Sequence, residues 1–185
     1  NNIIGCPGTI QNCSFINNEF AFTESAGLQI SNCLFQGNAV AIDEKRKNFP
    51  STPIKANPEN PEQVVKEVLF VGEHTCLGGG KKEYQGLSDY PLQWMINQAK
   101  KLGLEFNSTT SESEEFQIKP DPTIKFDNTV KGLSALGGEQ WRYFNTKVVT
   151  VHHSVVKRLK AFSDYRPKSL EPFLKALLDE DQQTE

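Results

Sequence analysis

The fold is decided by residues 64–80, which read VVKEVLFVGEHTCLGGG. The apolar run from Val68 to Val71 shows no alternation with polar residues, which favours a strand covered on both faces, as in a parallel sheet. The run leads into a polar, glycine-rich segment that contains His74. Open α/β sheets place their ligands just beyond the carboxyl ends of their strands, so this segment is the first candidate for a functional site.

Strands and helices are expected to alternate in the rest of the chain. A helix is predicted over residues 88–102, with Ser88 as its N-cap and Gly103 as its terminator. The other expected elements are a strand, a helix and a second, short helix, over residues 148–151, 153–159 and 169–178. This alternation indicates an α/β fold in one domain, residues 1–185, with helices flanking a mostly parallel sheet.

Two polar segments are expected to lie outside the core. Residues 107–123 are rich in Ser, Thr and Glu, which predicts a mobile loop. Residues 179–185 form an acidic end, which predicts a disordered tail.

The first 47 residues allow two interpretations. The pattern I-x-N-C-x-F occurs at 10–15 and again at 30–35, a spacing near one coil of a parallel β-helix. A solenoid needs at least about three such repeats, so we prefer a helix over 28–47. Asp43, Glu44 and Arg46 would then be a solvated helix end with one internal ion pair, and the alternative is a pair of site carboxylates.

Composition excludes several classes of protein. The formal net charge of −3 and the pI near 5.7 argue against a partner that is a nucleic acid. No apolar run approaches the roughly 18 residues of a transmembrane segment, and no signal peptide is visible. No two of the four cysteines have C-x-x-C spacing, which argues against a zinc site. Neither a metal nor a cofactor is expected.

Four segments of the sequence carry a family resemblance. They are AVAIDEKRKNF at 39–49, VLFVGEHTCLGGG at 68–80, GLSDYPLQWM at 86–95, and HHSVVKR at 152–158 with YRPKSL at 165–170. In this order they resemble a bacterial and fungal family of α/β-hydrolase domains (DUF2235) that includes phospholipase effectors of type VI secretion. The match is collinear from about 28 to 170, and corresponds to the C-terminal portion of such a hydrolase.

The resemblance implies ester hydrolysis by a Ser-Asp-His triad, with a phospholipid as the possible substrate. His74 matches the histidine that acts as general base and then as general acid. Gly78, Gly79 and Gly80 would let the backbone pass close to the site. Taken by themselves, the three glycines could offer bare N–H groups to a phosphate, and the alternative is a tight turn after the strand. Asp89 would help to fix the loop that carries the histidine. By contrast, His152 and His153 are expected to cap or to pack at a junction between a strand and a helix.

Several residues depart from the family pattern. No G-x-S-x-G nucleophile elbow occurs in the 185 residues. Asn2 aligns with the acidic residue of the triad, and an amide cannot stabilise an imidazolium as a carboxylate does. Asn38 stands where the family has a histidine. The chain is therefore expected to need a missing N-terminal half or a partner protein chain, and the alternative is a non-catalytic scaffold subunit. The expected location is the cytoplasm, or outside the cell as an effector secreted without a classical signal peptide.

Overall fold

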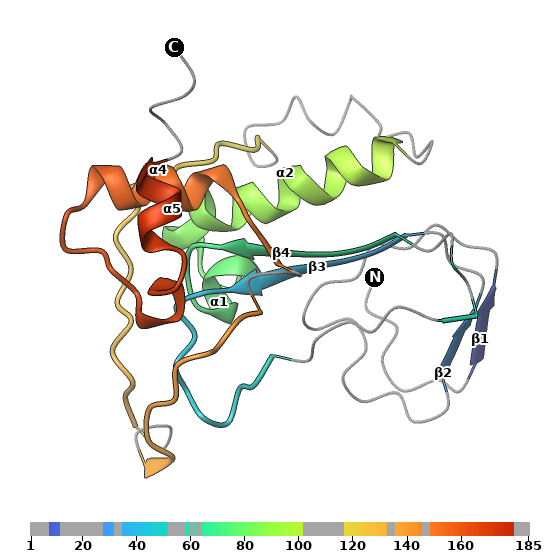
Figure 1. Cartoon of the computed structure of the whole chain (residues 1–185), viewed down its shortest axis with the longest axis horizontal. Coiled ribbons are helices and arrows are strands. Elements are labelled where there is room, and N and C mark those ends of the chain that lie inside the picture. The colour runs from blue at the N-terminus through green and yellow to red at the C-terminus, as the bar shows by residue number, and fades with distance from the viewer. Residues whose placement is uncertain are drawn as a thin grey trace.

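The computed structural model describes residues 8–11, 28–31, 35–51, 58–59, 61, 64–101, 117–132, 136–145 and 149–179. Its main sheet has the strand order β3-β4-β5, with β3 at Phe35–Ala41, β4 at Val64–Phe70 and β5 at Val149–Val151. All three strands are parallel. The helices α2 (Gln85–Lys101), α4 (His153–Ala161) and α5 (Leu174–Asp179) flank this sheet (Figure 1). The α/β class with a parallel sheet and flanking helices is thereby confirmed, and is consistent with part of an α/β-hydrolase fold.

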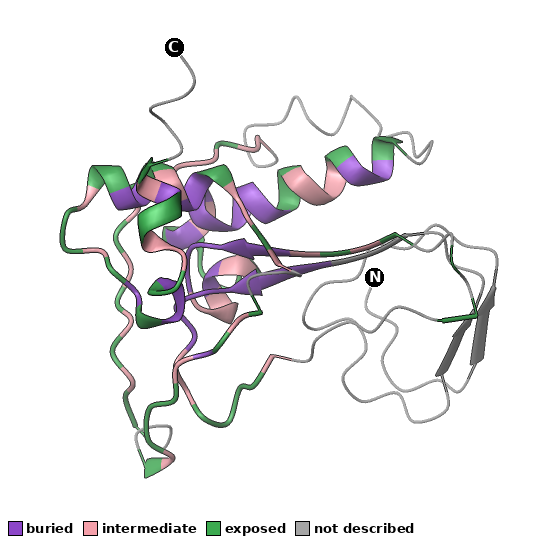
Figure 2. Cartoon of the chain, viewed as in Figure 1, coloured by how far each residue is buried: buried purple, intermediate pink, exposed green. Residues whose placement is uncertain are grey.

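Both faces of the sheet are covered, as the unbroken apolar run of β4 predicts. On one face Val68 and Phe70 pack with Ala39 against Tyr90, Trp94 and Met95 of α2. On the other face Leu69 and Val71 lie in one buried cluster with Val40 and Ile42. The C-terminal part of the chain covers this cluster with Val155, Leu159, Leu170 and Leu177. The buried residues lie along the two long strands and the inward sides of the helices (Figure 2). Burial of this apolar surface is the main stabilising contribution to the fold.

The helix expected over 28–47 is wrong. Residues 28–31 form strand β2 and residues 35–41 form β3, which pairs along its whole length with β4 from Phe35↔Val64 to Ala41↔Phe70. The apolar residues Ala39 to Ile42 are all buried because they fill both faces of this strand. A short apolar run fits a helix or a strand equally well, and here the long-range pairing with β4 decides.

A second, two-stranded sheet reflects the repeated sequence pattern. Strand β1, Gly8–Gln11, pairs in parallel with β2, Leu28–Ser31. Ile10 lies opposite Ile30, so the spacing of the two I-x-N-C-x-F copies is also the register of the pair. The described residues form two strands of this kind, and residues 12–15 and 32–34 of the pattern lie outside them.

The helix predicted from residue 88 onward is present, but it begins earlier than the sequence indicates. The short helix α1, His74–Leu77, directly follows the loop after β4. Helix α2 spans Gln85–Lys101 and continues directly from a 3₁₀ turn, η1, Lys82–Tyr84. Ser88 is therefore inside α2 and not its N-cap, and its hydroxyl donates to the carbonyl of Gln85. None of the described helices is long and apolar enough to cross a membrane.

The C-terminal part contains α4, His153–Ala161, a 3₁₀ turn η4, Lys168–Leu170, and α5, Leu174–Asp179. The expected helix over 169–178 is thus divided into a 3₁₀ turn and a short α-helix. The predicted loop over 107–123 lies outside the described residues up to 116, and the predicted tail lies outside them after 179.

Candidate active site

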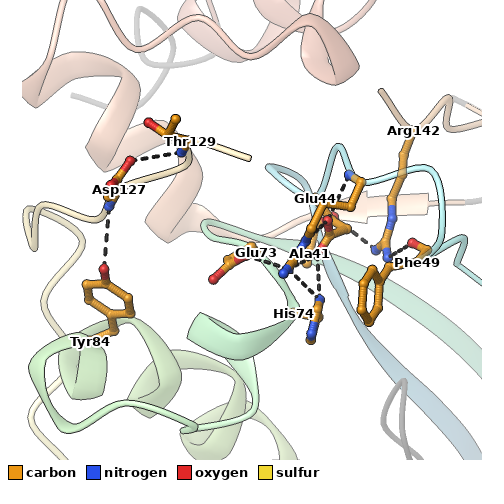
Figure 3. Close-up of polar contacts among 10 residues, drawn as sticks. Ala41, Glu44, Phe49, Glu73, His74, Tyr84, Asp127, Thr129 and Arg142 are labelled. Carbon is orange, nitrogen blue, oxygen red and sulfur yellow. Dashed lines mark hydrogen bonds and ion pairs between the residues drawn. The ribbon is translucent and has the colours of Figure 1, made fainter. Parts of the chain in front are cut away.

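The site lies where β3 and β4 end. Parallel strands bring their carboxyl ends to the same edge of a sheet, so Asp43 and Glu44 after β3 meet Glu73 and His74 after β4. Backbone pairing continues past the strands, since the amide of Ile42 donates to Phe70 and the amide of Asp43 donates to Gly72. Glu44, Glu73 and His74 converge at this edge (Figure 3).

Glu44 and His74 form a close acid–imidazole pair. Glu44 Oε2 lies 2.5 Å from His74 Nδ1, and the exposed fractions of the two side chains are 1% and 13%. Burial alone would raise the pKa of Glu44, but hydrogen bonds from Arg46 and His74 hold it well below its ordinary value. Glu44 is therefore a carboxylate at neutral pH, and it can accept a hydrogen bond from an Nδ1–H group.

Arg46 supplies a positive charge at the centre of the cluster. Its Nε donates to Glu44 Oε1 at 2.8 Å, its Nη2 donates to Glu44 Oε2 at 2.6 Å, and Nη2 also bonds to Glu73. Nη2 lies 2.9 Å from His74 Nδ1. The hydrogen bond to Glu44 raises the pKa of Arg46 further above its ordinary value, so the guanidinium remains charged.

The same three side chains have a spacing that could hold a metal ion. One ligand atom each from Glu44, Glu73 and His74 lie within 4.8 Å of one another. However, Arg46 Nη2 is within hydrogen-bond distance of all three residues, so the guanidinium occupies the place that an ion would need. We therefore assign the charge balance of the cluster to Arg46 and derive no step through a metal.

Phe49 forms an apolar platform beside the pair. Its ring stacks on the imidazole of His74 with centroids 4.5 Å apart and an interplanar angle of 20°. The Arg46 guanidinium lies 4.6 Å from the centroid of the same ring. The buried side chain of Arg142 holds the backbone here, because it donates to the carbonyls of Ala41 and Phe49 (Figure 3). The imidazole is thus fixed on one side by an aromatic ring.

Asp43 ties three parts of the chain together behind the site. Its Oδ2 accepts hydrogen bonds from the amide of Gly72 at 2.7 Å and from the hydroxyl of Tyr165 at 2.8 Å. Burial raises the pKa of Asp43 to about 6, although both hydrogen bonds act in the opposite direction. Asp43 and Glu44 are therefore buried members of the site, and the solvated helix end expected from the sequence is wrong. The internal ion pair of Glu44 with Arg46 is confirmed.

The raised pKa of Asp43 predicts a pH dependence of stability. Its ordinary pKa is 3.8 and its value in the fold is about 6, so between these pH values the folded chain keeps a proton that the unfolded chain releases. The contribution of Asp43 to the free energy of unfolding should therefore fall by about 3 kcal/mol as the pH rises through this window. The variant Asp43→Asn should lack this part of the fall, as urea unfolding between pH 4 and pH 7 can measure. Parallel curves for the two proteins would contradict the assignment.

The structure gives the three expected glycines a local role. The amide of Gly78 donates to the carbonyl of His74, and the amide of Gly80 donates to that of Thr75. These two N–H groups close α1, so they are not bare donors for a phosphate as the sequence suggested. Gly79 has a φ of 72°, a conformation that favours glycine. The turn that ends α1 is therefore the physical reason for at least this glycine.

Asp89 lies on α2, and the histidine pair directly follows β5. Asp89 is buried, and its Oδ2 accepts a hydrogen bond from the amide of Lys119 at 2.7 Å, so its side chain fixes residue 119. His152 is the N-cap of α4 and accepts from the amide of Ser154, which confirms the expected capping. Burial lowers the pKa of His152 to about 4, which keeps this ring neutral at physiological pH.

Sequence reasoning missed Glu44 as a partner of His74. The available signal was the apolar run Ala39 to Ile42, which ends two residues before Glu44 much as the run Val68 to Val71 ends before His74. Asn2, the residue aligned with the acidic member of the triad, lies outside the described residues. Asn38 is buried in the middle of β3, where its Nδ2 donates to Glu67 Oε1 at 3.3 Å.

Comparison with known proteins identifies a family. Residues 2–98, just over half of the chain, match the family model described as "T6SS, Phospholipase effector Tle1-like, catalytic domain". The matched range includes β3, β4 and every member of the cluster around His74. Comparisons with curated proteins and with solved structures gave no match.

Proposed function

The chain belongs to the family of Tle1-like type VI secretion phospholipase effectors, and from this premise we propose that Glu44 and His74 are the acid and the base of a serine-type phospholipid hydrolysis. The observation that carries the proposal is the 2.5 Å contact between Glu44 Oε2 and His74 Nδ1. In this chain Glu44 takes the place of the acidic residue that Asn2 does not provide.

The geometry supports a definite division of labour. Glu44 accepts the Nδ1–H hydrogen bond, which leaves the lone pair of Nε2 to take a proton from a serine hydroxyl as its oxygen attacks the ester carbonyl. The resulting imidazolium, stabilised by the carboxylate of Glu44, then gives that proton to the departing alcohol. Water repeats the sequence to release the fatty acid. The order acid then histidine along the chain agrees with that of α/β-hydrolases.

The nucleophile is proposed to come from another part of the hydrolase fold. The 185 residues contain no G-x-S-x-G elbow, so we assign the serine to a missing N-terminal half or to a partner protein chain. Phe49, with an exposed fraction of 37%, offers an apolar contact beside the base that suits an acyl chain. A phospholipid is accordingly the proposed substrate.

A pair of glutamate variants tests the proposal. In the longest natural protein that contains this chain, Glu44→Gln should lower phospholipase activity by about 10³- to 10⁴-fold, because an amide no longer stabilises the imidazolium. Glu73→Gln makes the same chemical change at a residue that also binds Arg46, and it should lower the activity by less than about tenfold, in the range of an indirect contact. Equal losses in the two variants would contradict the role of Glu44.

A second candidate function is that of a non-catalytic subunit built on a hydrolase fold. The departures from the family pattern favour it, since Asn2 stands where the family has an acidic residue and Asn38 where it has a histidine. If the natural protein is folded but inactive on phospholipid vesicles, this result would support the second candidate over the first.

A further inference from the structure

The Nδ1 atom of His74 has two competing partners. Glu44 Oε2 lies 2.5 Å from it and Arg46 Nη2 lies 2.9 Å from it, both within hydrogen-bond distance. A carboxylate oxygen can only accept a hydrogen bond, and a guanidinium nitrogen can only donate one. A neutral imidazole has either a hydrogen or a lone pair on Nδ1, so it can bond to one of these partners at a time.

The two choices correspond to the two tautomers of the ring. With the hydrogen on Nδ1 the ring donates to Glu44, and its Nε2 lone pair is available as a base. With the lone pair on Nδ1 the ring accepts from Arg46, and Nε2 carries the hydrogen and cannot take a proton. The contact with Glu44 therefore favours a competent base, while the contact with Arg46 favours an incompetent one.

Arg46 also weakens the hold of Glu44 on the ring. It binds both carboxylate oxygens, through Nε to Oε1 and through Nη2 to Oε2, so that Oε2 is shared between Arg46 and His74. Nη2 has two hydrogens for three neighbours, which are Glu44 Oε2, Glu73 and His74 Nδ1, so a bond to the ring replaces a bond to one of the two glutamates. The ring of Phe49 also holds the guanidinium in place, and the exposed fraction of the Arg46 side chain is only 20%. The competition is consequently built into the site.

We propose that Arg46 is a positioning residue that competes with Glu44 for Nδ1 of His74 and so sets the fraction of rings in the base-competent tautomer. This inference rests on the proposed function, because it assigns a consequence to the tautomer of the proposed base. Removal of Arg46 from the ring, by substitution or by an anion that binds its Nη2, shifts His74 toward the competent form.

Tautomer populations can be measured directly by nitrogen NMR of the histidine side chains in the natural protein that contains this chain. At alkaline pH, where imidazole rings are neutral, wild-type His74 should show nitrogen shifts between those of the two pure tautomers. Arg46→Met should move the ratio toward Nδ1–H by about fivefold or more, the effect of losing one hydrogen bond. Glu44→Ala should move it in the opposite direction. The His74 signals are assigned by their loss in His74→Gln.

A charge-matched variant separates the contact from the general field. Lys45→Met removes the same charge one residue away, where Lys45 pairs with Glu139 and not with His74, and it should leave the ratio unchanged. A single pure tautomer in the wild-type protein would overturn the proposal without any substitution, and so would an equal shift in the Lys45 and Arg46 variants.

Failure of the proposed function would look different. If His74→Ala retained phospholipase activity, His74 would not be the base, yet the measured tautomer ratios would still confirm or refute the competition at Nδ1.

Discussion

Replacing His74 by alanine is expected to lower the phospholipase activity of the natural protein by about 10⁴- to 10⁶-fold, the loss seen when a triad histidine is removed. The reason is that alanine can neither take the proton of the nucleophile nor return it to the departing alcohol. Hydrolysis of phospholipid vesicles, followed by release of fatty acid, measures the effect.

His153→Ala is the matched control for this loss. His153 is an exposed histidine at the start of α4, and its ring packs against the rings of Tyr90 and His152. Its variant should retain full activity. If the His153 variant is inactive and the His74 variant is active, the base has been assigned to the wrong histidine.

Gly72→Ala is expected to destabilise the fold by about 2–4 kcal/mol. Gly72 ends the pairing of β4 with a φ of 115°, and a Cβ atom there would lie 2.7 Å from Cys76 Cβ. Both the backbone strain and the clash with α1 act two residues before His74, so the substitution should also displace the imidazole and lower the activity. Urea unfolding of the natural protein and its variant measures the loss of stability.

Gly132→Ala separates strain from clash. Gly132 also has a positive φ, 64°, but no atom of the part of the chain that the structure describes lies within 4 Å of the position of an added Cβ. Its variant should lose only the cost of the backbone conformation, about 1 kcal/mol. An equal loss at the two glycines would show that the approach of α1 to Gly72 contributes nothing.

The central strand could be predicted from the sequence because its signal is local. The unbroken run Val68 to Val71 is buried on both faces of the sheet, as such runs are in parallel sheets. The strand β3 could not be predicted in this way, because it contains Gly37 and Asn38, both poor strand formers, and its apolar residues also fit a helix. Its pairing with β4, a contact between distant parts of the chain, decides its structure.

The helix wrongly expected over 28–47 also affected the prediction of the candidate site, because one of its two central residues was found and the other was not. His74 could be found because it follows a recognisable strand and matches a family motif. Glu44 was assigned to a solvated helix end, since an expected helix over 28–47 placed it among charged neighbours. Once β3 is a strand, the carboxyl ends of β3 and β4 meet, and Glu44 becomes the residue that contacts His74. The wrong secondary structure thus separated Glu44 from the histidine that it contacts.

The family membership gives the cluster its chemical context. A Tle1-like phospholipase catalytic domain implies a lipid substrate, and the buried carboxylate beside an imidazole is the arrangement that ester hydrolysis uses. The shared contacts of Arg46 add a feature that an acid–histidine pair does not require. Its position explains how three charged side chains and a histidine can be packed together at one edge of the sheet.

The most direct test of whether Glu44 acts through His74 is the phospholipase activity of the double variant Glu44→Gln/His74→Ala. Residues that act as one unit are not additive, so the double variant should be no less active than His74→Ala alone. If instead the losses of the two single variants multiply in the double variant, Glu44 acts independently of His74, and the proposed acid–base pair is contradicted.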